Sequence, residues 1–310
     1  MLKFQTNCAL DDASLWQLLQ EDVPYGDLTT ASLPLQGQPG RLTFKARSAM
    51  TLCGSEEAMR LLQLVGADVV LHSASGSQLP ADALILEAQG PVPALHHAWK
   101  VAQNLVEWAS GMASVASAMV AAATPVAVAC TRKSVPGVKA MSVKAVRAGG
   151  ARMHRLGLSE SLLIFAEHRL YLDMPPAQTV ALLKQQEPEK KVVVEVSNIA
   201  EALSWAEAGA DALQLEKFTP AQLEQLLIEL DQQLHTQHDS PLNTERKPVA
   251  ISTASQVRSL SPRRPLLIAA GGINCQNVAD YVQAGAQLIV TSAPYSAPPR
   301  DVAVRFLLLD

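Results

Sequence analysis

Residues 192–216, VVVEVSNIAEALSWAEAGADALQLE, carry the pattern of a strand, a helix and a second strand. The apolar run 192–196 is followed by a segment with helical spacing, in which Ala202, Leu203 and Ala206 share one face. Gly209 stands where that helix would end, directly before the second apolar run. Because unbroken apolar strands that alternate with helices are typical of a parallel sheet covered by helices, these residues predict an α/β fold.

The same alternation continues on both sides of this segment. Gly285 ends a second helix-like segment just before the last apolar run, as Gly209 does in the first. A polar, turn-rich segment at 235–248 is expected to form an exposed loop. The other predicted strands are the apolar runs at 126–130, 161–165, 249–252, 266–270 and 286–291.

Residues 1–105 show a different pattern. A predicted helix at 13–23, capped by Asp11 or Asp12, is followed by a mixture of short strands and a second helix. This mixture indicates a smaller α+β domain, which a long helical segment at about 95–122 joins to the rest. The strand-like runs are 41–47, 50–54, 67–71 and 83–90, and the second helix is 55–66.

The composition is that of a globular chain and excludes several classes of protein. Of its 310 residues, 48% are hydrophobic and 4% aromatic, so the core is expected to consist of aliphatic side chains. The formal net charge of −4 argues against a general nucleic-acid binder. No signal peptide or membrane-spanning segment is expected, which predicts a cytoplasmic protein without a membrane partner. The absence of a CxxC pair favours reduced cysteines over disulfides or a zinc site, the four being Cys8, Cys53, Cys130 and Cys275.

Polar residues and glycines follow several of the predicted strands, at the point where each strand ends. Because ligands bind at the carboxyl ends of the strands in α/β barrels and open α/β sheets, we expect these residues to meet at one edge. They are Arg132 and Lys133 after the first strand, Glu195 and Glu216 at the ends of later ones, Gly271 and Gly272 after 266–270, and Ser292 after 286–291.

Cations are concentrated in two neighbouring segments, TRKSVPGVK at 131–139 and GGARMHRLGL at 149–158. Such a cluster in an acidic chain suits a ligand with phosphate or carboxylate groups. Arg132 and Lys133 lie between a strand and a Pro-Gly turn, which favours binding. Lys139, Lys144 and Arg147 are instead expected on a solvated helix face.

Two glutamates interrupt or close apolar strands. Glu195 lies inside VVVEV, and Glu216 ends the next strand. A buried carboxylate needs a cation, a metal or a ligand beside it. The pair could stabilise positive charge that develops on a sugar carbon, or hold a divalent ion. The alternative is a structural salt bridge to Lys133 or Arg155.

Further residues have a functional and a structural interpretation that the sequence leaves open. Gly271 and Gly272 could bind phosphate at a helix N-terminus, or form only a tight turn. The segment TSAPYS at 291–296 could add a second set of phosphate donors. His154 and His168 could each transfer protons, although His168 could equally be structural, and His96–His97 is expected to be an exposed pair.

The dispersed motifs together resemble one family. EDVPYGDLTT, TRKSVPGVK, GGARMHRLGL, VVVEV, DALQLEKFTP, AAGGI and AQLIVTSAPYS occur in the order and spacing of quinolinate phosphoribosyltransferases, also called nicotinate-nucleotide pyrophosphorylases. The resemblance spans nearly the whole chain. Within that family, RLGLSES followed by FAEH is similar to the ModD proteins, which are linked with molybdenum transport.

The resemblance implies both an architecture and a reaction. It implies an N-terminal α/β sandwich domain (1–108, joined by a C-terminal tail at about 297–310) and an α/β barrel domain (109–296) with the active site, in a homodimer or larger homo-oligomer. It also implies transfer of phosphoribose from phosphoribosyl pyrophosphate, with Mg²⁺, to the ring nitrogen of quinolinate, with loss of carbon dioxide. For this chain we expect an anionic, carboxylate-bearing nitrogen heterocycle as the acceptor. Pyrophosphate is released.

Roles carry over to matching positions of this sequence. Lys133 falls on a lysine that meets substrate phosphates, and Glu195 and Glu216 fall on carboxylates near the ribose and the metal. The catalytic residues expected from this match are Glu195, Glu216 and Lys133. The expected acid-substrate residues are Lys100, Arg132, His154, Arg155 and His168, and the expected phosphate loops contain Ala270, Gly271, Gly272 and Ser292.

The sequence departs from the family pattern mainly in the acid-binding part. Phe165 replaces a substrate-binding lysine, and Lys100 stands where the neighbouring subunit would offer an arginine. Glu216-Lys217 replaces an Asp-Asn pair, and Ala270 replaces a serine that contacts phosphate. Loss of a cation weakens binding of a dicarboxylate, so the acceptor need not be quinolinate. Ordinary quinolinate phosphoribosyltransferase activity and a non-catalytic oxyanion- or nucleotide-binding regulator are the alternatives.

Overall fold

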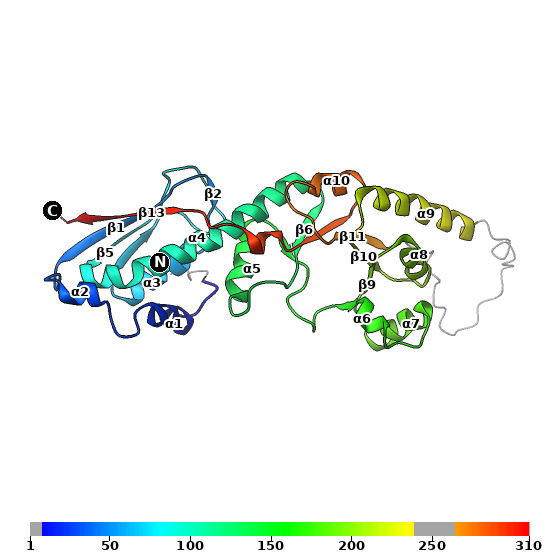
Figure 1. Ribbon diagram of the computed structural model, residues 1–310, viewed down its shortest axis with the longest axis horizontal. Coiled ribbons are helices and arrows are strands. Elements are labelled where there is room, and N and C mark those ends of the chain that lie inside the picture. Colours follow the sequence, from blue (N-terminus) through cyan, green and yellow to red (C-terminus); the bar gives the residue numbers. More distant parts are fainter. Residues whose placement is uncertain (1–7, 239–263, 310) are drawn as a thin grey trace, which may run out of the picture. The chain divides into compact units, whose positions relative to one another are not determined.

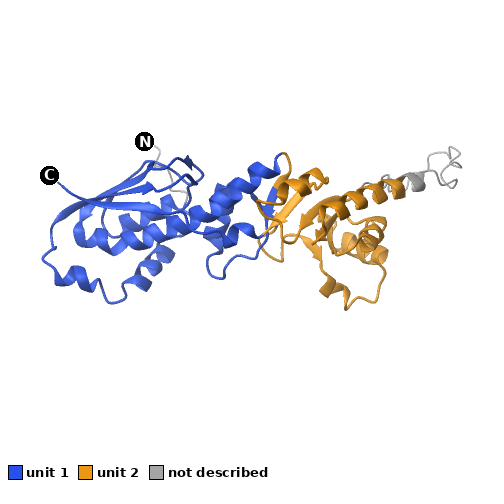
Figure 2. Cartoon of the chain, turned by 45° about the horizontal axis from the view of Figure 1, so that its top comes forward, with its two compact units in different colours: residues 1–124, 128–154, 292–310 blue, residues 125–127, 155–291 orange. Residues whose placement is uncertain are grey.

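The computed structural model describes residues 8–238 and 264–309 (Figure 1). The chain forms two compact units, shown in different colours in Figure 2. The first unit contains the chain up to Thr124, Val128–His154 and the chain from Ser292 onward. The second contains Pro125–Ala127 and Arg155–Thr291. The predicted strand at 249–252 lies outside the described residues.

The first unit is built on a four-stranded antiparallel sheet with the order β13-β1-β5-β3. Its C-terminal strand, β13, pairs with β1 over seven residues, and Figure 1 shows the two side by side. Fully buried aliphatic and aromatic side chains such as Leu42, Phe44 and Leu86 form the core against the helices. The strands are β1 (Pro39–Ala46), β3 (Asp68–Leu71), β5 (Leu84–Pro91) and β13 (Val302–Leu308), and the helices packed on this core are α1 (Asp12–Asp22), α3 (Ser55–Leu64) and α4 (Val92–Ala123).

Helix α4 is the centre of the first unit. It has 32 residues and is the single helix in the described part of the chain that is long and apolar enough to cross a membrane. Its buried positions run from Leu95 to Ala123, and it packs against α3, α5, β1 and β5. These contacts identify α4 as the core helix of a folded domain.

Shorter elements complete the first unit. Asp11 caps α1 and accepts a hydrogen bond from the Ser14 amide, as the sequence predicts. The strand predicted at 126–130 is present as β6, whereas its parallel partner β7 and the C-terminal strand β13 were not predicted as strands. The remaining elements are α2 (Leu28–Ser32), β2 (Met50–Thr51), β4 (Gln78–Leu79), β6 (Ala127–Cys130), α5 (Lys139–Ala148), β7 (Arg152–Met153) and the 3₁₀ helix η2 (Ala293–Ser296).

The second unit repeats strand and helix as the sequence predicts. The seven-stranded sheet of the chain has the order β7-β6-β12-β11-β10-β9-β8, and the pairs from β8 to β12 are all parallel. Gly209, with φ 86°, follows α8 at its predicted end. The strands are β8 (Leu162–Ile164), β9 (Val192–Val196), β10 (Ala212–Glu216), β11 (Leu266–Ala270) and β12 (Leu288–Thr291), and the helices are α6 (Ala166–Arg169), α7 (Pro176–Gln186), α8 (Ile199–Glu207), α9 (Pro220–His238) and α10 (Val278–Gln283).

Three expectations about exposed segments are wrong. Helix α9 continues to His238, so residues 235–238 are helical, while 239–248 lie outside the described residues. His96 and His97 are half-buried, and the His96 ring stacks on Phe306 with the ring centroids 4.6 Å apart. The third correction concerns Lys144.

Lys144 lies inside an ion-pair cluster and not on a solvated helix face. Its Nζ donates to Glu57 Oε2 at 2.7 Å and to Glu56 Oε2 at 2.9 Å, and its side chain is only 12% exposed. The prediction failed because the two carboxylates, in the first turn of α3, are more than 80 residues away in the chain. Lys139 and Arg147, on the same helix, are exposed as expected.

Candidate functional site

The carboxyl ends of β9 and β10 carry three polar side chains on one face of the sheet. Glu195 pairs with Gln214 across the two strands, and Gln214 Nε2 donates to Glu195 Oε2 at 2.7 Å. Glu216 lies two residues after Gln214 and therefore on the same face. Glu195 and Glu216, the two predicted carboxylates, are thus brought together at one edge of the second unit.

Gln214 was missed in the prediction. Its side chain is buried, at 6% exposure, and its amide holds the Glu195 carboxylate in place. The signal was present in DALQLE, because a polar residue two positions before Glu216 must share its face in a strand.

The glycine loop after β11 lies beside the same edge. Ala270 pairs with Glu216 across β11 and β10, and Gly271 and Gly272 follow with φ 89° and 73°. A Cβ on Gly271 would lie 3.0 Å from Glu216 Oε1 and 2.9 Å from both the Cγ and the main-chain nitrogen of Lys217. The left-handed backbone and this close approach both require glycine at position 271.

This loop does not lie at a helix N-terminus. Helix α10 begins at Val278, six residues after Gly272, and is only six residues long. The intervening turn is held by hydrogen bonds from the Asn274 amide to Asn277 Oδ1 and from Asn277 Nδ2 to the Gly272 carbonyl. Any phosphate at this loop would therefore rely on loop amides and nearby cations and not on a helix dipole.

An aromatic and cationic stack follows β8 in the same unit. The buried Arg155 guanidinium lies 5.2 Å from the centroid of the Phe165 ring, and the His168 ring stacks on Phe165 with centroids 5.7 Å apart. Ile164, the last residue of β8, pairs with Val194, so Phe165 comes level with Glu195. Arg169 Nη1 donates to the Glu195 carbonyl at 2.8 Å and ties α6 to the end of β9.

The hydrogen bond of His168 defines what this ring can do. Its Nδ1 accepts from the Phe165 amide at 2.9 Å. The proton of the neutral ring must then be on Nε2, because Nδ1 is used as an acceptor. His168, which is exposed, is therefore arranged to donate a hydrogen bond from Nε2.

The other predicted cations belong to the first unit and follow β6 and β7. These strands pair in parallel, and the His154 amide donates to the Cys130 carbonyl at 2.9 Å. Arg132 and Lys133, two and three residues beyond β6, are exposed, and His154 is half-buried. Burial raises the pKa of the Cys130 thiol to about 12, so this cysteine is not a nucleophile near neutral pH.

Tyr295 anchors the start of the Arg132–Lys133 segment. Its hydroxyl donates to the Thr131 carbonyl at 2.6 Å. Burial raises the pKa of Tyr295, so the hydroxyl stays protonated and remains a donor. Ser292 is exposed at the start of the 3₁₀ helix that carries Tyr295. This hydrogen bond joins the segment 292–296 to the start of the Arg132–Lys133 segment.

Lys100 is separate from these groups. It is exposed on α4, where its Nζ donates to Gln103 Oε1 at 2.8 Å and lies 4.2 Å from the centroid of the Trp99 ring. Both contacts are within its own helix. Its expected contribution to a neighbouring subunit stays a prediction.

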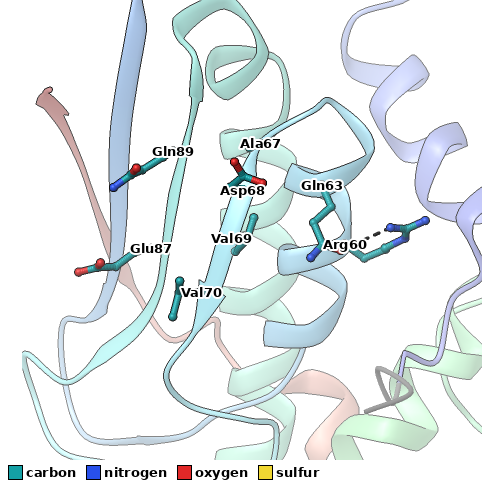
Figure 3. A pocket seen from close by; sticks show the side chains of 8 residues that line it. All are labelled: Arg60, Gln63, Ala67, Asp68, Val69, Val70, Glu87 and Gln89. Carbon is teal, nitrogen blue, oxygen red and sulfur yellow. Dashed lines mark hydrogen bonds between the residues drawn. The ribbon is translucent and has the colours of Figure 1, made fainter. Parts of the chain in front are cut away.

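A groove of about 590 Å³ in the first unit contains none of the predicted residues. Figure 3 shows its lining residues, which come from α3, β3 and β5 and their flanks. Its cation Arg60 is paired with Asp12 at 2.6 Å, and its acid Glu87 is paired with Arg41. These two charges are already neutralised within the unit. Asp68, which also lines the groove, has no ion pair in residues 8–238 and 264–309, so the groove offers a ligand one carboxylate and no free cation.

The two carboxylates of the β9–β10 edge fit a hard divalent cation. No group of three or more His, Cys, Asp or Glu side chains in residues 8–238 and 264–309 is arranged to hold a metal. Mg²⁺, however, commonly takes one or two protein carboxylates and completes its shell with water and substrate phosphates. Glu195 and Glu216, next to a glycine loop, match that donor set.

Comparisons with known proteins identify the family of the chain. The family model for the N-terminal domain of quinolinate phosphoribosyl transferase matches residues 27–110, and that for the C-terminal domain matches residues 112–305. ModD of Rhodobacter capsulatus is 56% identical over 69% of this chain and 85% of its own length. ModD of Pasteurella multocida is 36% identical over 98% of both chains.

Solved structures show the same fold. The nicotinate-nucleotide pyrophosphorylase from Francisella tularensis has a TM-score of 0.80 and 22% sequence identity, and covers 98% of this chain and 100% of its own. The expected fold class, an α/β barrel domain with an N-terminal α/β sandwich, is confirmed. With family models that together match most of its length, the chain belongs to the quinolinate phosphoribosyltransferase family of pentosyltransferases.

Proposed function

We propose that the protein transfers phosphoribose from phosphoribosyl pyrophosphate to a ring nitrogen of an anionic heterocycle and releases pyrophosphate. The observation that carries this proposal is the edge at which Glu195 and Glu216 lie on one sheet face, beside a loop that accepts only glycine at position 271. Two carboxylates suit a sugar carbon that becomes positive, and open loop amides suit phosphate.

The carboxylates act by electrostatics in this proposal. As pyrophosphate departs, positive charge develops on the ribose carbon, and Glu195 and Glu216 stabilise it without a covalent bond. Gln214 holds Glu195 through its 2.7 Å hydrogen bond, so this carboxylate does not need to reorient during the reaction. Lys133 neutralises phosphate charge on the same co-substrate.

Glu195 and Glu216 would hold Mg²⁺ together with substrate phosphates. Bound there, the ion would neutralise charge on the departing pyrophosphate. Loop contacts to phosphate oxygens would come from Ala270, Gly271, Gly272 and Ser292.

The acceptor is bound by cations and an aromatic face. The Phe165 ring, stacked with Arg155 and His168, offers a surface on which a flat heterocycle can stack. Arg132, His154 and Arg155 supply charge for one anionic group. A phenylalanine cannot bind a second carboxylate as a lysine would, so a monocarboxylate suits the site better than quinolinate does.

Some expectations from the resemblance also remain proposals. From the resemblance to the ModD proteins, we also propose a role connected with molybdenum transport. We further propose that the protein acts in the cytoplasm as a homodimer or larger homo-oligomer, in which Lys100 serves the neighbouring subunit's site.

A pyrophosphate-release assay with phosphoribosyl pyrophosphate, Mg²⁺ and nitrogen heterocycles bearing no, one or two carboxylates tests the proposal. We expect turnover to be fastest with a monocarboxylate. Phe165→Lys should shift the preference toward quinolinate, and Phe165→Leu is the matched variant without the charge.

The opposite result is equally clear in this assay. If no acceptor supports turnover although the donor binds, the chain is a binding protein and not a transferase. Calorimetry separates the two, because an oxyanion sensor should bind molybdate or phosphate without Mg²⁺, whereas a transferase should need the ion for donor affinity.

A further inference from the structure

Lys217 has an unusual backbone conformation at the end of β10. Its φ is 59°, and Asp82 is the one other non-glycine residue with positive φ in residues 8–238 and 264–309. Aspartate tolerates this left-handed region because its short side chain can bond locally, but a long lysine side chain gains no such compensation. The strained residue follows directly after Glu216, at the candidate site.

The surroundings hold Lys217 in this conformation. Its amide donates to the Ala270 carbonyl at 2.8 Å, and the next residue, Phe218, is buried. Its Cγ would lie 2.9 Å from a Cβ on Gly271, so the aliphatic stem passes directly against the glycine loop. The ammonium group is three bonds beyond Cγ and is therefore within reach of a ligand bound at the glycine loop.

The ammonium group is not used within the described structure. Lys217 is exposed, and its Nζ has no carboxylate within 4.0 Å in residues 8–238 and 264–309. This differs from Lys184 of the same unit, whose Nζ contacts Asp211 Oδ1 at 3.3 Å and the Gly209 carbonyl at 2.7 Å. Glycine or asparagine would fit the backbone of position 217 with less strain, so what lysine adds there is its charge.

We infer that Lys217 is a phosphate-binding residue of the donor substrate, with its ammonium group directed to a phosphate held at the Gly271–Gly272 loop. This inference rests on the proposed function and names a residue that the family resemblance does not assign. The phosphate can be the pyrophosphate or the 5′-phosphate of phosphoribosyl pyrophosphate, since both present the same anionic oxygens. A lysine supplies a point charge for either.

Calorimetry on the full chain with Mg²⁺ tests this inference. The ligands are phosphoribosyl pyrophosphate, pyrophosphate and ribose 5-phosphate, and the variants are Lys217→Asn and Lys217→Gly. Loss of one charge-assisted hydrogen bond should weaken binding of phosphoribosyl pyrophosphate by about 10-fold to 100-fold. Pyrophosphate and ribose 5-phosphate each carry one of the two kinds of phosphate in the donor. The one whose affinity falls together with that of phosphoribosyl pyrophosphate identifies the phosphate that Lys217 contacts. The matched control, Lys190→Asn, removes an exposed lysine of the same unit and should leave affinity unchanged.

Thermal unfolding separates binding from a structural role. Because glycine removes the strain at position 217, Lys217→Gly should raise the Tm or leave it unchanged while it weakens donor binding. A Tm that falls together with affinity would assign Lys217 a structural role and overturn the inference. Unchanged donor affinity in Lys217→Asn would overturn it too, with the proposed function intact. If the wild-type protein binds no phosphoribosyl pyrophosphate, both the inference about Lys217 and the proposed function are rejected.

Discussion

Two regions of the molecule use the same residue types in opposite ways. In the first unit, Lys144 lies between the carboxylates of Glu56 and Glu57. In the second unit, Glu195, Glu216 and Lys217 again combine two glutamates with one lysine at the ends of β9 and β10. We call these the closed cluster and the open cluster.

The closed cluster is saturated with partners. Besides the two contacts of Lys144, the Ser75 amide donates to Glu56 Oε1 at 2.8 Å and the Ala9 amide donates to Glu57 Oε1 at 2.6 Å. Glu57 is fully buried, at 0% exposure. Every charged group of this cluster has hydrogen-bond or ion-pair partners within the fold, so the cluster stabilises α3 against α5 and is not arranged to bind a ligand.

The open cluster keeps two of its charges, those of Glu216 and Lys217, available. Glu216 and Lys217 have no ion-pair partner in the described ranges, 8–238 and 264–309, and they lie where parallel strands end. The comparison teaches that residue type alone does not identify a catalytic group. The number of partners already satisfied within the fold separates a structural ion pair from a candidate site.

The largest effect is expected from breaking the closed cluster. Lys144→Met leaves two carboxylates in a buried site without their cation, which should lower the free energy of unfolding by about 3–5 kcal/mol. Urea denaturation followed by circular dichroism measures this change in the free energy of unfolding. Lys139→Met, on the exposed part of the same helix, should stay within about 0.5 kcal/mol of wild type. A similar small change for Lys144→Met would show that the closed cluster is not stabilising.

The next largest effect is expected from a change in the open cluster. It should appear in activity and not in stability. Glu216→Gln keeps the shape of the side chain but removes the charge that opposes the developing positive centre. We expect kcat to fall by about 10²–10³-fold, which corresponds to about 2.7–4 kcal/mol. The free energy of unfolding should not decrease. Glu224→Gln, an exposed change on α9, serves as the control, and an equal loss of activity there would contradict the assignment.

The strands and the two carboxylates of the open cluster could be predicted from the sequence, because the signals for them lie within short segments of the chain. The apolar runs at 192–196 and 211–215 predict strands, and the structure has them at Val192–Val196 and, one residue later than predicted, at Ala212–Glu216. Glu195 and Glu216 stand out because a carboxylate in such a run is costly. Their position at one edge follows from the parallel arrangement of the strands.

The partners could not be predicted because they depend on contacts between distant parts of the chain. Nothing near Lys144 in the sequence indicates Glu56 or Glu57, which come from another helix. The left-handed backbone of Lys217 is equally hidden, since lysine has no preference for it. Gln214 is different, because its spacing from Glu216 already places both side chains on one face of a strand.

The smallest effect is expected from titrating the closed cluster, because opposing influences nearly balance there. Burial, the strongest single influence, raises the pKa of Glu56, but hydrogen bonds from Ser75 and the charge and hydrogen bond of Lys144 together lower it below its usual value of 4.5. The unfolded chain therefore binds the proton more readily than the folded chain does. The stabilisation is present above about pH 4.5 and is lost as the pH falls through the lower, folded pKa.

Urea denaturation from pH 6 down to pH 3 measures this loss. Glu56→Gln should flatten the acid part of the stability curve, and Ser75→Ala should flatten it less, because the Lys144 contact remains. The double variant should behave as Glu56→Gln alone, since both changes act through one carboxylate. If Glu56→Gln kept the full acid slope, the partners of Glu56 would contribute nothing in acid, and the distinction between a saturated and an open cluster would lose its energetic basis.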